Sequence, residues 1–417
     1  MRIKYSRLMA IIGLSVILVG CGGVDTPDRV NPIGGEVVVD MDGASIKKTM
    51  LDANMPGVDD STIVYGYKAY KIPYVTTDEF GKSISASGLM VIPTGMPEAV
   101  YQIGLSMVSD DHGTIMADYE APTVSAIESS SPEGSAVILT SLAGFVTLQP
   151  DYIGFGDARE SYHPYMLKKS LANSTIDFII QAQKFANENN IKLNGQLFLT
   201  GYSEGGYASM ATIKQIEQST NIKVAMSAPM AGPYDLNSTA FGVLSMSEIE
   251  YPSFIADIGY AYGVTYNQDM EDIFNEPYAS KMDELFSGVY NREEVDNQLV
   301  TTVTGNFGLY KPSFVNDFFS NSQNWFRRAV VENSVDSWGA KTPVRLVHCE
   351  GDDIIPYAIS EITLKKMTMA GSKDVSIVPV ESTLGINRKL GHISCAIFAY
   401  GLTADMFATV RKNTMKY

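Results

Sequence analysis

Five residues, Gly201-Tyr202-Ser203-Glu204-Gly205, have the types and the spacing of a nucleophilic serine held in a tight turn. An apolar run bounded by glycines, 196–200, precedes them and predicts a buried strand, while small residues at 206–211 open a helical pattern. The glycines allow a turn so sharp that the serine stands above the sheet edge, at a helix N-terminus that stabilises developing negative charge. A Gly-x-Ser-x-Gly in this strand-turn-helix setting predicts a serine nucleophile for acyl transfer.

The base that such a serine needs must come from four histidines, His112, His163, His348 and His392. His392 follows a strand-like run at 375–380 and precedes a C-terminal helical pattern, which suits the chain order serine, acid, histidine. We therefore assign the general base to His392, with a structural loop histidine as the alternative. His163 could line the substrate pocket, but a surface or structural role is favoured for it. A structural role, rather than that of a second base, is expected for His348.

The acid that orients the base is expected in segment 343–356, where an apolar strand runs into an acidic turn closed by Pro356. An aspartate at the end of a parallel strand can orient an imidazole and stabilise its charged form. Asp352 and Asp353 compete for this role, and the spacing to Pro356 favours Asp352. We expect Asp353 to be a neighbour or a turn residue.

Taken together, these motifs resemble the α/β-hydrolase superfamily, and specifically its bacterial and fungal secretory lipase and esterase group. The resemblance spans roughly residues 60–412 and rests on 149–157 with His163-Pro164-Tyr165, on 201–206, on 332–338 leading into 343–344, and on His112-Gly113-Thr114. It implies that Ser203, Asp352 and His392 form a catalytic triad that cleaves carboxylic esters through an acyl-enzyme. No cofactor or metal ion is implied.

The same resemblance implies an oxyanion hole made by the backbone N–H of Glu204 and by an N–H of the turn Gly113-Thr114. Asp110 and Asp111 depart from the family pattern because they place negative charge beside this site. Cys349 stands where the family usually has glycine after the histidine of the acid strand. To the Glu204 side chain we assign packing and a favourable charge at a helix start, but no chemistry.

The alternation of short apolar strands with helical stretches predicts an α/β fold with a mostly parallel sheet covered by helices on both faces. An antiparallel hairpin is expected at 63–73 and 83–93, followed by strands at 101–108, 144–148, 196–200, 224–228, 344–348 and 375–380. The alternation stops between 236 and 340, so we expect an α/β-hydrolase core at 61–236 and 341–417 and an inserted helical cap at 237–340. Tyr, Phe and Met side chains of the cap could line an acyl pocket or form the cap's own core.

The N-terminus predicts export. Three basic residues precede an apolar run at 8–19, which is too short to span a membrane. The run ends in Leu18-Val19-Gly20-Cys21, which resembles a bacterial lipobox, so 1–21 is expected to be a signal peptide and Cys21 a lipid anchor. An incidental cysteine after a cleaved signal is the alternative. Glycine at 22 gives no signal for inner-membrane retention, and 22–60 is expected to be a tether and N-terminal extension. The expected location is the cell envelope, on the outer membrane.

The composition agrees with an exported globular enzyme. A net charge of −16 argues against nucleic acid as a partner, and 417 residues with 45% hydrophobic content can bury a large core. Besides Cys21 there are Cys349 and Cys395, which flank the proposed acid and base. They could pair in an oxidising compartment, but we favour two free buried thiols.

Three functions fit these residues. The leading one is hydrolysis of a small-molecule or lipid ester by a serine esterase or lipase. The same fold also permits polysaccharide deacylation or peptide cleavage, which the fold alone does not distinguish. The alternative from another class is a lipid-anchored binding protein without catalysis.

Overall fold

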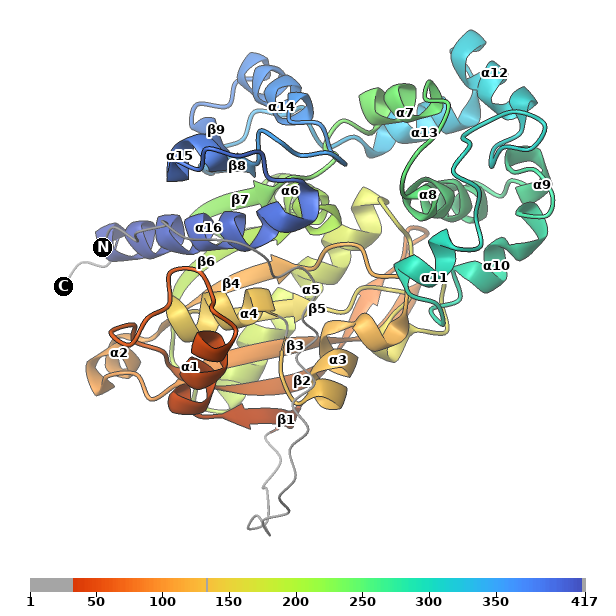
Figure 1. Ribbon diagram of the computed structural model, residues 1–417. Coiled ribbons are helices and arrows are strands. Elements are labelled where there is room, and N and C mark those ends of the chain that lie inside the picture. Colours follow the sequence, from red (N-terminus) through yellow and green to blue (C-terminus); the bar gives the residue numbers. More distant parts are fainter. Residues whose placement is uncertain (1–32, 133, 415–417) are drawn as a thin grey trace.

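A nine-stranded sheet runs through the computed structural model, which describes residues 33–132 and 134–414. The expected signal peptide and Cys21 lie outside the described residues. The strand order is β1-β2-β3-β5-β4-β6-β7-β8-β9 (Figure 1). The strands are β1 (Glu36–Met41), β2 (Gly66–Thr77), β3 (Ser83–Thr94), β4 (Leu105–Asp111), β5 (Val146–Pro150), β6 (Leu193–Tyr202), β7 (Met226–Met230), β8 (Val344–His348) and β9 (Val375–Pro379).

Most of this sheet is parallel, as the sequence predicted. Strands β5, β4, β6, β7, β8 and β9 are parallel to one another, whereas β1, β2 and β3 form the antiparallel end, in which β3 pairs antiparallel with β5. The predicted strand at 101–108 is wrong in its first residues, because these end the helix α2 (Glu98–Ile103) and Gly104, with φ 105°, separates the helix from β4. Part of the expected N-terminal extension, 36–41, pairs with β2 as the edge strand.

Helices cover both faces of the sheet. On β6, Leu197 and Leu199 pack in the cluster that holds α5 (Lys168–Glu188) and α6 (Glu204–Ser219), whereas Phe198 lies 4.7 Å from the ring of Phe407 on α16 (His392–Thr414). Successive side chains of a strand point to opposite faces, so α5 and α6 lie on one face and α16 on the other. The other core helices are α1 (Gly43–Asp52), α3 (Pro122–Ser129), α4 (Gly134–Val137), α14 (Ala358–Met369) and α15 (Val380–Leu384).

Helix α16 is a core helix. Over His392–Asn413 it is the one helix within the described residues that is long and apolar enough to cross a membrane, by length and composition alone. Its residues Cys395, Phe398, Ala399 and Phe407 are buried in the cluster against the sheet. A buried core helix has the same length and hydropathy as a span, so this finding carries no argument for membrane insertion.

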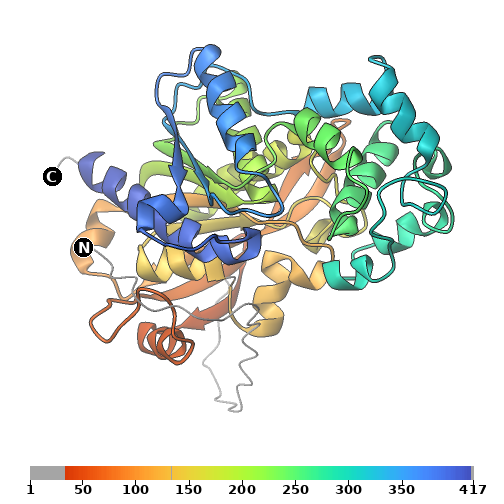
Figure 2. The same cartoon turned by 45° about the horizontal axis from the view of Figure 1, so that its top comes forward.

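The segment between β7 and β8 is helical and lies beyond one end of the sheet in both ribbon views (Figures 1 and 2). Its aromatic rings pack on one another: the ring centroids of Tyr310 lie 5.0 Å from Phe274 and 5.5 Å from Phe314. Much of the aromatic content of this segment therefore forms the segment's own core. The helices are α7 (Leu236–Leu244), α8 (Pro252–Thr265), α9 (Met270–Ile273), α10 (Met282–Leu285), α11 (Arg292–Asp296), α12 (Pro312–Ser320) and α13 (Trp325–Asn333).

Candidate active site

Ser203 occupies the turn between β6 and α6 in a backbone conformation that side chains rarely adopt, φ 60° and ψ −118°. The glycines around it are required by close packing. A Cβ on Gly201 would lie 2.4 Å from the carbonyl oxygen of Asp111, and one on Gly205 would lie 1.8 Å from the same atom. The end of β4 therefore passes directly against the turn, which fixes Ser203 from the backbone side.

The structure brings Ser203, His392 and Asp352 together. Ser203 Oγ lies 2.9 Å from His392 Nε2, and His392 Nδ1 lies 2.7 Å from Asp352 Oδ2. Asp353 accepts a hydrogen bond from the backbone N–H of His392 at 2.8 Å, so it holds the main chain of the histidine and not its ring. Of the two aspartates, the geometry favours Asp352 as the partner of the imidazole.

The side chain of Asp352 has no exposed surface and is surrounded by donors. Its Oδ1 accepts from the backbone N–H groups of Ile354 at 3.0 Å and Ile355 at 2.8 Å. Its Oδ2 lies 3.2 Å from His348 Nε2, in addition to its contact with His392. Burial alone would raise the pKa of Asp352, but hydrogen bonds from the two histidines hold it well below its usual range. The carboxylate therefore stays ionised where an imidazolium has to be stabilised.

His348 is buried and has the structural surroundings that the sequence suggested. Its Nε2 lies 3.0 Å from the carbonyl oxygen of Ile355, which can only accept, so Nε2 carries the hydrogen that also points toward Asp352. Its Nδ1 lies 2.7 Å from the hydroxyl of Ser360. The ring thus donates to the carboxylate from the side opposite His392, a contact that the sequence gave no means to predict.

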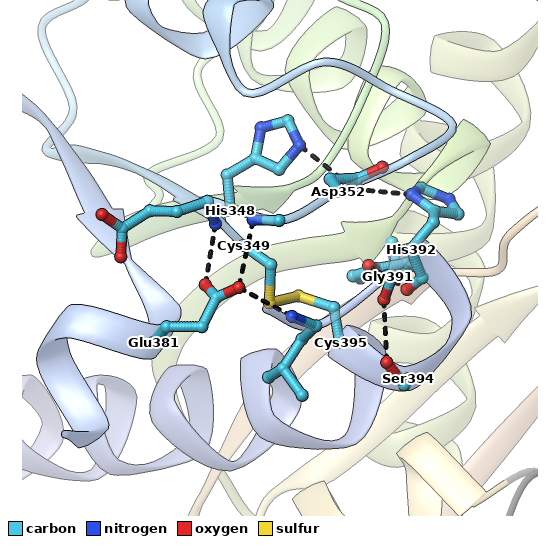
Figure 3. Close-up of a disulfide and its surroundings, with 12 residues drawn as sticks. His348, Cys349, Asp352, Glu381, Gly391, His392, Ser394 and Cys395 are labelled. Carbon is cyan, nitrogen blue, oxygen red and sulfur yellow. Dashed lines mark hydrogen bonds and ion pairs between the residues drawn. A yellow bond between two sulfur atoms is a disulfide. The ribbon is translucent and has the colours of Figure 1, made fainter. Parts of the chain in front are cut away.

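The expectation of two free thiols is wrong. Cys349 and Cys395 form a disulfide with a Cα–Cα distance of 6.1 Å (Figure 3). The physical reason is that the tertiary fold brings the two cysteines together. Cys349 directly follows β8, Cys395 lies in the first turn of α16, and the end of β8 lies beside the start of α16 although the cysteines are 46 positions apart. The bond therefore links the segment that carries Asp352 to the helix that carries His392.

A buried carboxylate reinforces the same connection. Glu381, 6% exposed, accepts hydrogen bonds from the backbone N–H groups of Glu350 at 2.7 Å, Gly351 at 3.1 Å and Leu390 at 3.0 Å. Figure 3 shows Glu381 beside the disulfide, between the turn before Asp352 and the residues before His392. Glu381 thus holds together the two loops that position the acid and the base.

The turn expected to complete an oxyanion hole lies against the nucleophile. A Cβ on Gly113 would sit 3.2 Å from the carbonyl oxygen of Tyr202 and 3.9 Å from Ser203 Cβ. The hydroxyl of Thr114 lies 2.9 Å from the hydroxyl of Tyr165. Ring atom Nδ1 of the preceding His112 lies 2.8 Å from the carbonyl oxygen of Gly113. The backbone of this turn therefore lies directly against the turn that carries Ser203.

Asp110 and Asp111, the departures from the family pattern, are fully buried beneath this turn. Burial raises the pKa of Asp110 to about 6 and that of Asp111 well above its usual value. The hydroxyl of Thr175 donates to Asp111 at 2.8 Å, and the side-chain amide of Gln149 donates to Asp110 at 3.0 Å. Burial favours the neutral form of Asp111, which lessens the negative charge beneath the nucleophile.

Glu204 has a partner that the sequence analysis missed. Its side chain is fully buried, and its Oε1 forms an ion pair with His163 Nε2 at 2.8 Å. His163 Nδ1 lies 2.8 Å from the carbonyl oxygen of Ile153, so it must carry a hydrogen. Burial alone would lower the pKa of His163, but the Glu204 carboxylate raises it above the usual value. The structure supports the structural role favoured for His163, and it also places this residue in the lining of a pocket, the alternative role. Both residues stood in recognised motifs, but no sequence signal joins them.

A small pocket opens beside this pair, and the lining residues with polar side-chain groups are His163, Asp257 and Tyr260. Met116, Phe155 and Phe286 provide apolar walls. Asp257 comes from α8, and burial raises its pKa to about 8. Within residues 33–132 and 134–414, no group of three or more His, Cys, Asp or Glu side chains is placed to hold a metal ion.

Comparison with known proteins gives one family and one fold. The model of the secretory lipase family matches residues 133–400. No curated protein sequence matches the chain significantly.

Several solved structures are similar over nearly the whole chain. A candidate hydrolase from Legionella pneumophila has a TM-score of 0.80 and 23% identity, covering 92% of this chain and 99% of its own. The rice cell wall degrading esterase LipA from Xanthomonas oryzae has a TM-score of 0.76 and 23% identity, with 93% and 99% covered. Candida antarctica lipase A in its closed state has a TM-score of 0.64 and 13% identity, with 93% and 83% covered. At these identities the structural likeness shows the fold, which is that of the α/β-hydrolases.

Proposed function

The chain belongs to the secretory lipase family and is a carboxylic ester hydrolase, and from this premise we propose that it works through a Ser203–His392–Asp352 triad and an acyl-enzyme. The observation that carries the proposal is the unbroken chain of short contacts, 2.9 Å from Ser203 Oγ to His392 Nε2 and 2.7 Å from His392 Nδ1 to Asp352 Oδ2. This is the relative geometry of nucleophile, base and orienting acid that serine hydrolases of unrelated folds share.

Each group has one role in the first half-reaction. Ser203 Oγ attacks the ester carbonyl carbon while His392 Nε2 takes the hydroxyl proton, and ionised Asp352 stabilises the imidazolium that results. The tetrahedral intermediate then collapses, and His392 gives the proton to the leaving alcohol. In the second half-reaction a water molecule attacks the acyl-enzyme by the same route and releases the acid.

The negative oxygen of the intermediate needs donors that are in place before the reaction. We assign this role to the backbone N–H of Glu204, at the first position of α6, and to an N–H of the Gly113-Thr114 turn. The closeness of Gly113 to Ser203 supports the second assignment. The ion pair between His163 and Glu204 fixes the side chain of the residue that supplies the first donor.

The remaining assignments concern the whole chain. We propose that 237–340 is a cap inserted into a core of 61–236 and 341–417, since this stretch is helical and lies beyond the end of the sheet in both views. Membership of a secretory family suggests an exported protein. We further propose that export ends in lipidation of Cys21, so that the enzyme is held on the outer membrane by its N-terminus.

Hydrolysis of nitrophenyl esters from acetyl to palmitoyl tests the triad, with a protein of residues 22–417 and its Ser203→Ala variant. Ser209→Ala is the matched control, because Ser209 is a buried serine of the same helix that donates to the carbonyl oxygen of Gly206 at 3.1 Å. We expect activity and labelling by a fluorophosphonate probe in the wild type and the control, and neither in Ser203→Ala. Equal activity in all three proteins would refute the role of Ser203.

A further inference from the structure

Asp257 is a buried carboxyl group without a hydrogen-bond partner. It is 3% exposed on α8 of the cap, and within the described residues no donor forms a hydrogen bond to it. It also lines the small pocket, so its carboxyl group faces the space that a ligand could enter. The carboxyl oxygens of Asp257 are not among the fully buried unpaired atoms, so their hydrogen-bonding capacity is open to a group that enters the pocket.

The lining of the pocket does not include Ser203, but two of its residues connect it to the proposed oxyanion donors. His163 lines the pocket and binds the side chain of Glu204, the residue after Ser203. Ile115, another lining residue, follows directly after the Gly113-Thr114 turn. A group of the substrate that entered this pocket would therefore lie near the scissile ester bond.

The surroundings of Asp257 select the chemistry of that group. An alkyl group would leave the carboxyl group unpaired in an apolar space. An ammonium group would be repelled by protonated His163, because the Glu204 carboxylate raises the pKa of that histidine in spite of its burial. A hydroxyl group meets neither objection. Because burial raises the pKa of Asp257 to about 8, its carboxyl group is largely protonated at pH 7 and can both donate to and accept from a hydroxyl.

We propose that Asp257 binds a hydroxyl group of the ester substrate, so that this enzyme acts preferentially on esters with a hydroxyl group close to the scissile bond. The inference rests on the proposed function, because the pocket serves substrate binding only if Ser203 is the nucleophile. The hydroxyl can belong to the acyl chain or to the alcohol, and both sources present the same chemistry to Asp257.

Matched ester pairs test the proposal and separate the two sources. The first pair is nitrophenyl butanoate and nitrophenyl 3-hydroxybutanoate, which differ in the acyl chain. The second pair is propyl butanoate and the butanoate monoester of propane-1,3-diol, which differ in the alcohol. We expect kcat/KM to be roughly tenfold higher for the hydroxylated member of at least one pair, the order of discrimination given by one buried hydrogen bond.

Three variants assign that preference to a residue. Asp257→Asn keeps a donor and an acceptor and should retain the preference, whereas Asp257→Leu should lose it and gain activity on the plain alkyl ester. Asp272→Leu, at an exposed aspartate of the cap, is the matched control and should behave as the wild type. An unchanged ratio in Asp257→Leu would overturn the proposal.

Measurements on the wild type alone also test the proposal, whether or not Asp257→Leu folds. A wild type that hydrolyses both members of both pairs equally well overturns the inference about Asp257 and leaves the proposed function standing. A wild type with no Ser203-dependent activity on any of the four esters contradicts the proposed function itself.

Discussion

Removal of the disulfide should cost a large part of the protein's stability and little of its activity at 25 °C. The double substitution Cys349→Ala with Cys395→Ala removes the link between the acid turn after β8 and the first turn of α16. Glu381 and Asp353 still join the same two segments through four backbone hydrogen bonds. The triad should therefore keep its geometry in the folded protein, while the unfolded chain gains freedom.

The expected loss follows from the length of the closed loop. The cysteines are separated by 46 residues, for which the chain-entropy relation gives roughly 4 kcal/mol at 25 °C. Average unfolding entropies per residue give a chain of this size about 0.8 kcal/mol per kelvin at its midpoint. The double variant should accordingly have a Tm lower by about 5 °C.

Thermal melting followed by circular dichroism measures this difference on residues 22–417, which contain no cysteine besides Cys349 and Cys395. Wild type is melted with and without a thiol reductant, and the double variant under both conditions is the control. Reductant should lower the Tm of the wild type toward that of the variant and leave the variant unchanged.

Two results would refute this reasoning. One is a pair of thiols titrated in the unfolded, unreduced wild type, since the cysteines would then not be bonded. The other is a variant whose Tm equals that of the oxidised wild type, since the loop closure would then contribute nothing to stability.

Three further predictions concern the side chains around the site. His348→Leu removes a hydrogen-bond donor from Asp352, whose carboxylate then stabilises protonated His392 more strongly, so the acidic limb of the pH profile of kcat/KM should move to higher pH. His348→Gln keeps a donor, so its acidic limb should stay at the wild-type position. An unmoved limb in both variants would leave His348 with a packing role only. Glu381→Gln should lower the free energy of unfolding in urea by about 3 kcal/mol, because an amide cannot accept all three backbone N–H groups; a change below 1 kcal/mol, the size of one neutral hydrogen bond, would contradict this. Asp257 has its pKa raised from 3.8 to about 8 by burial, so the unfolded state loses that proton first and stability should fall as the pH rises from about 4 to 8. Asp257→Asn should lack this part of the decline in urea unfolding at pH 5 and pH 8, and equal slopes in both proteins would refute it.

The parallel strands were predictable because they are short apolar runs, and all but the edge strand β9 have residues buried on both faces. The run Val344–His348 has the predicted bounds, and β9 differs by one residue. The edge strand Glu36–Met41 was missed because a single apolar run beside a glycine- and proline-rich stretch gives no sign of its partner. At 101–103 the sequence analysis predicted a strand where the structure has a helix. Three residues are too few to distinguish the period of a helix from that of a strand.

The site divides in the same way. The Gly-x-Ser-x-Gly motif pointed to Ser203, and the order that a triad on this fold imposes on the sequence pointed to His392. Chain order together with the spacing to Pro356 pointed to Asp352. Contacts between side chains are a different matter. The disulfide and the ion pair of His163 with Glu204 join residues that are 46 and 41 positions apart in the sequence. Such contacts depend on the tertiary fold, and the type of a residue does not identify its partner.

The triad can be understood as two rigid units that dock. Ser203 is fixed through its backbone. The end of β4 packs against the turn on one side, and on the other side the backbone N–H of Ser203 donates to the carbonyl oxygen of Met230 at 2.9 Å. Asp352 and His392 form the second unit, since disulfide, carboxylate and backbone contacts bind their segments to each other. The hydroxyl of Tyr202 joins the units, because it donates to the carbonyl oxygen of His392 at 2.6 Å from within the nucleophile turn. Helix α16 also packs on the sheet through Phe407 and Phe198, so the Tyr202 hydroxyl is one of several contacts that set the Ser203–His392 distance. It is the contact that lies next to Ser203 in the sequence, and its loss would loosen the docking without disturbing either unit.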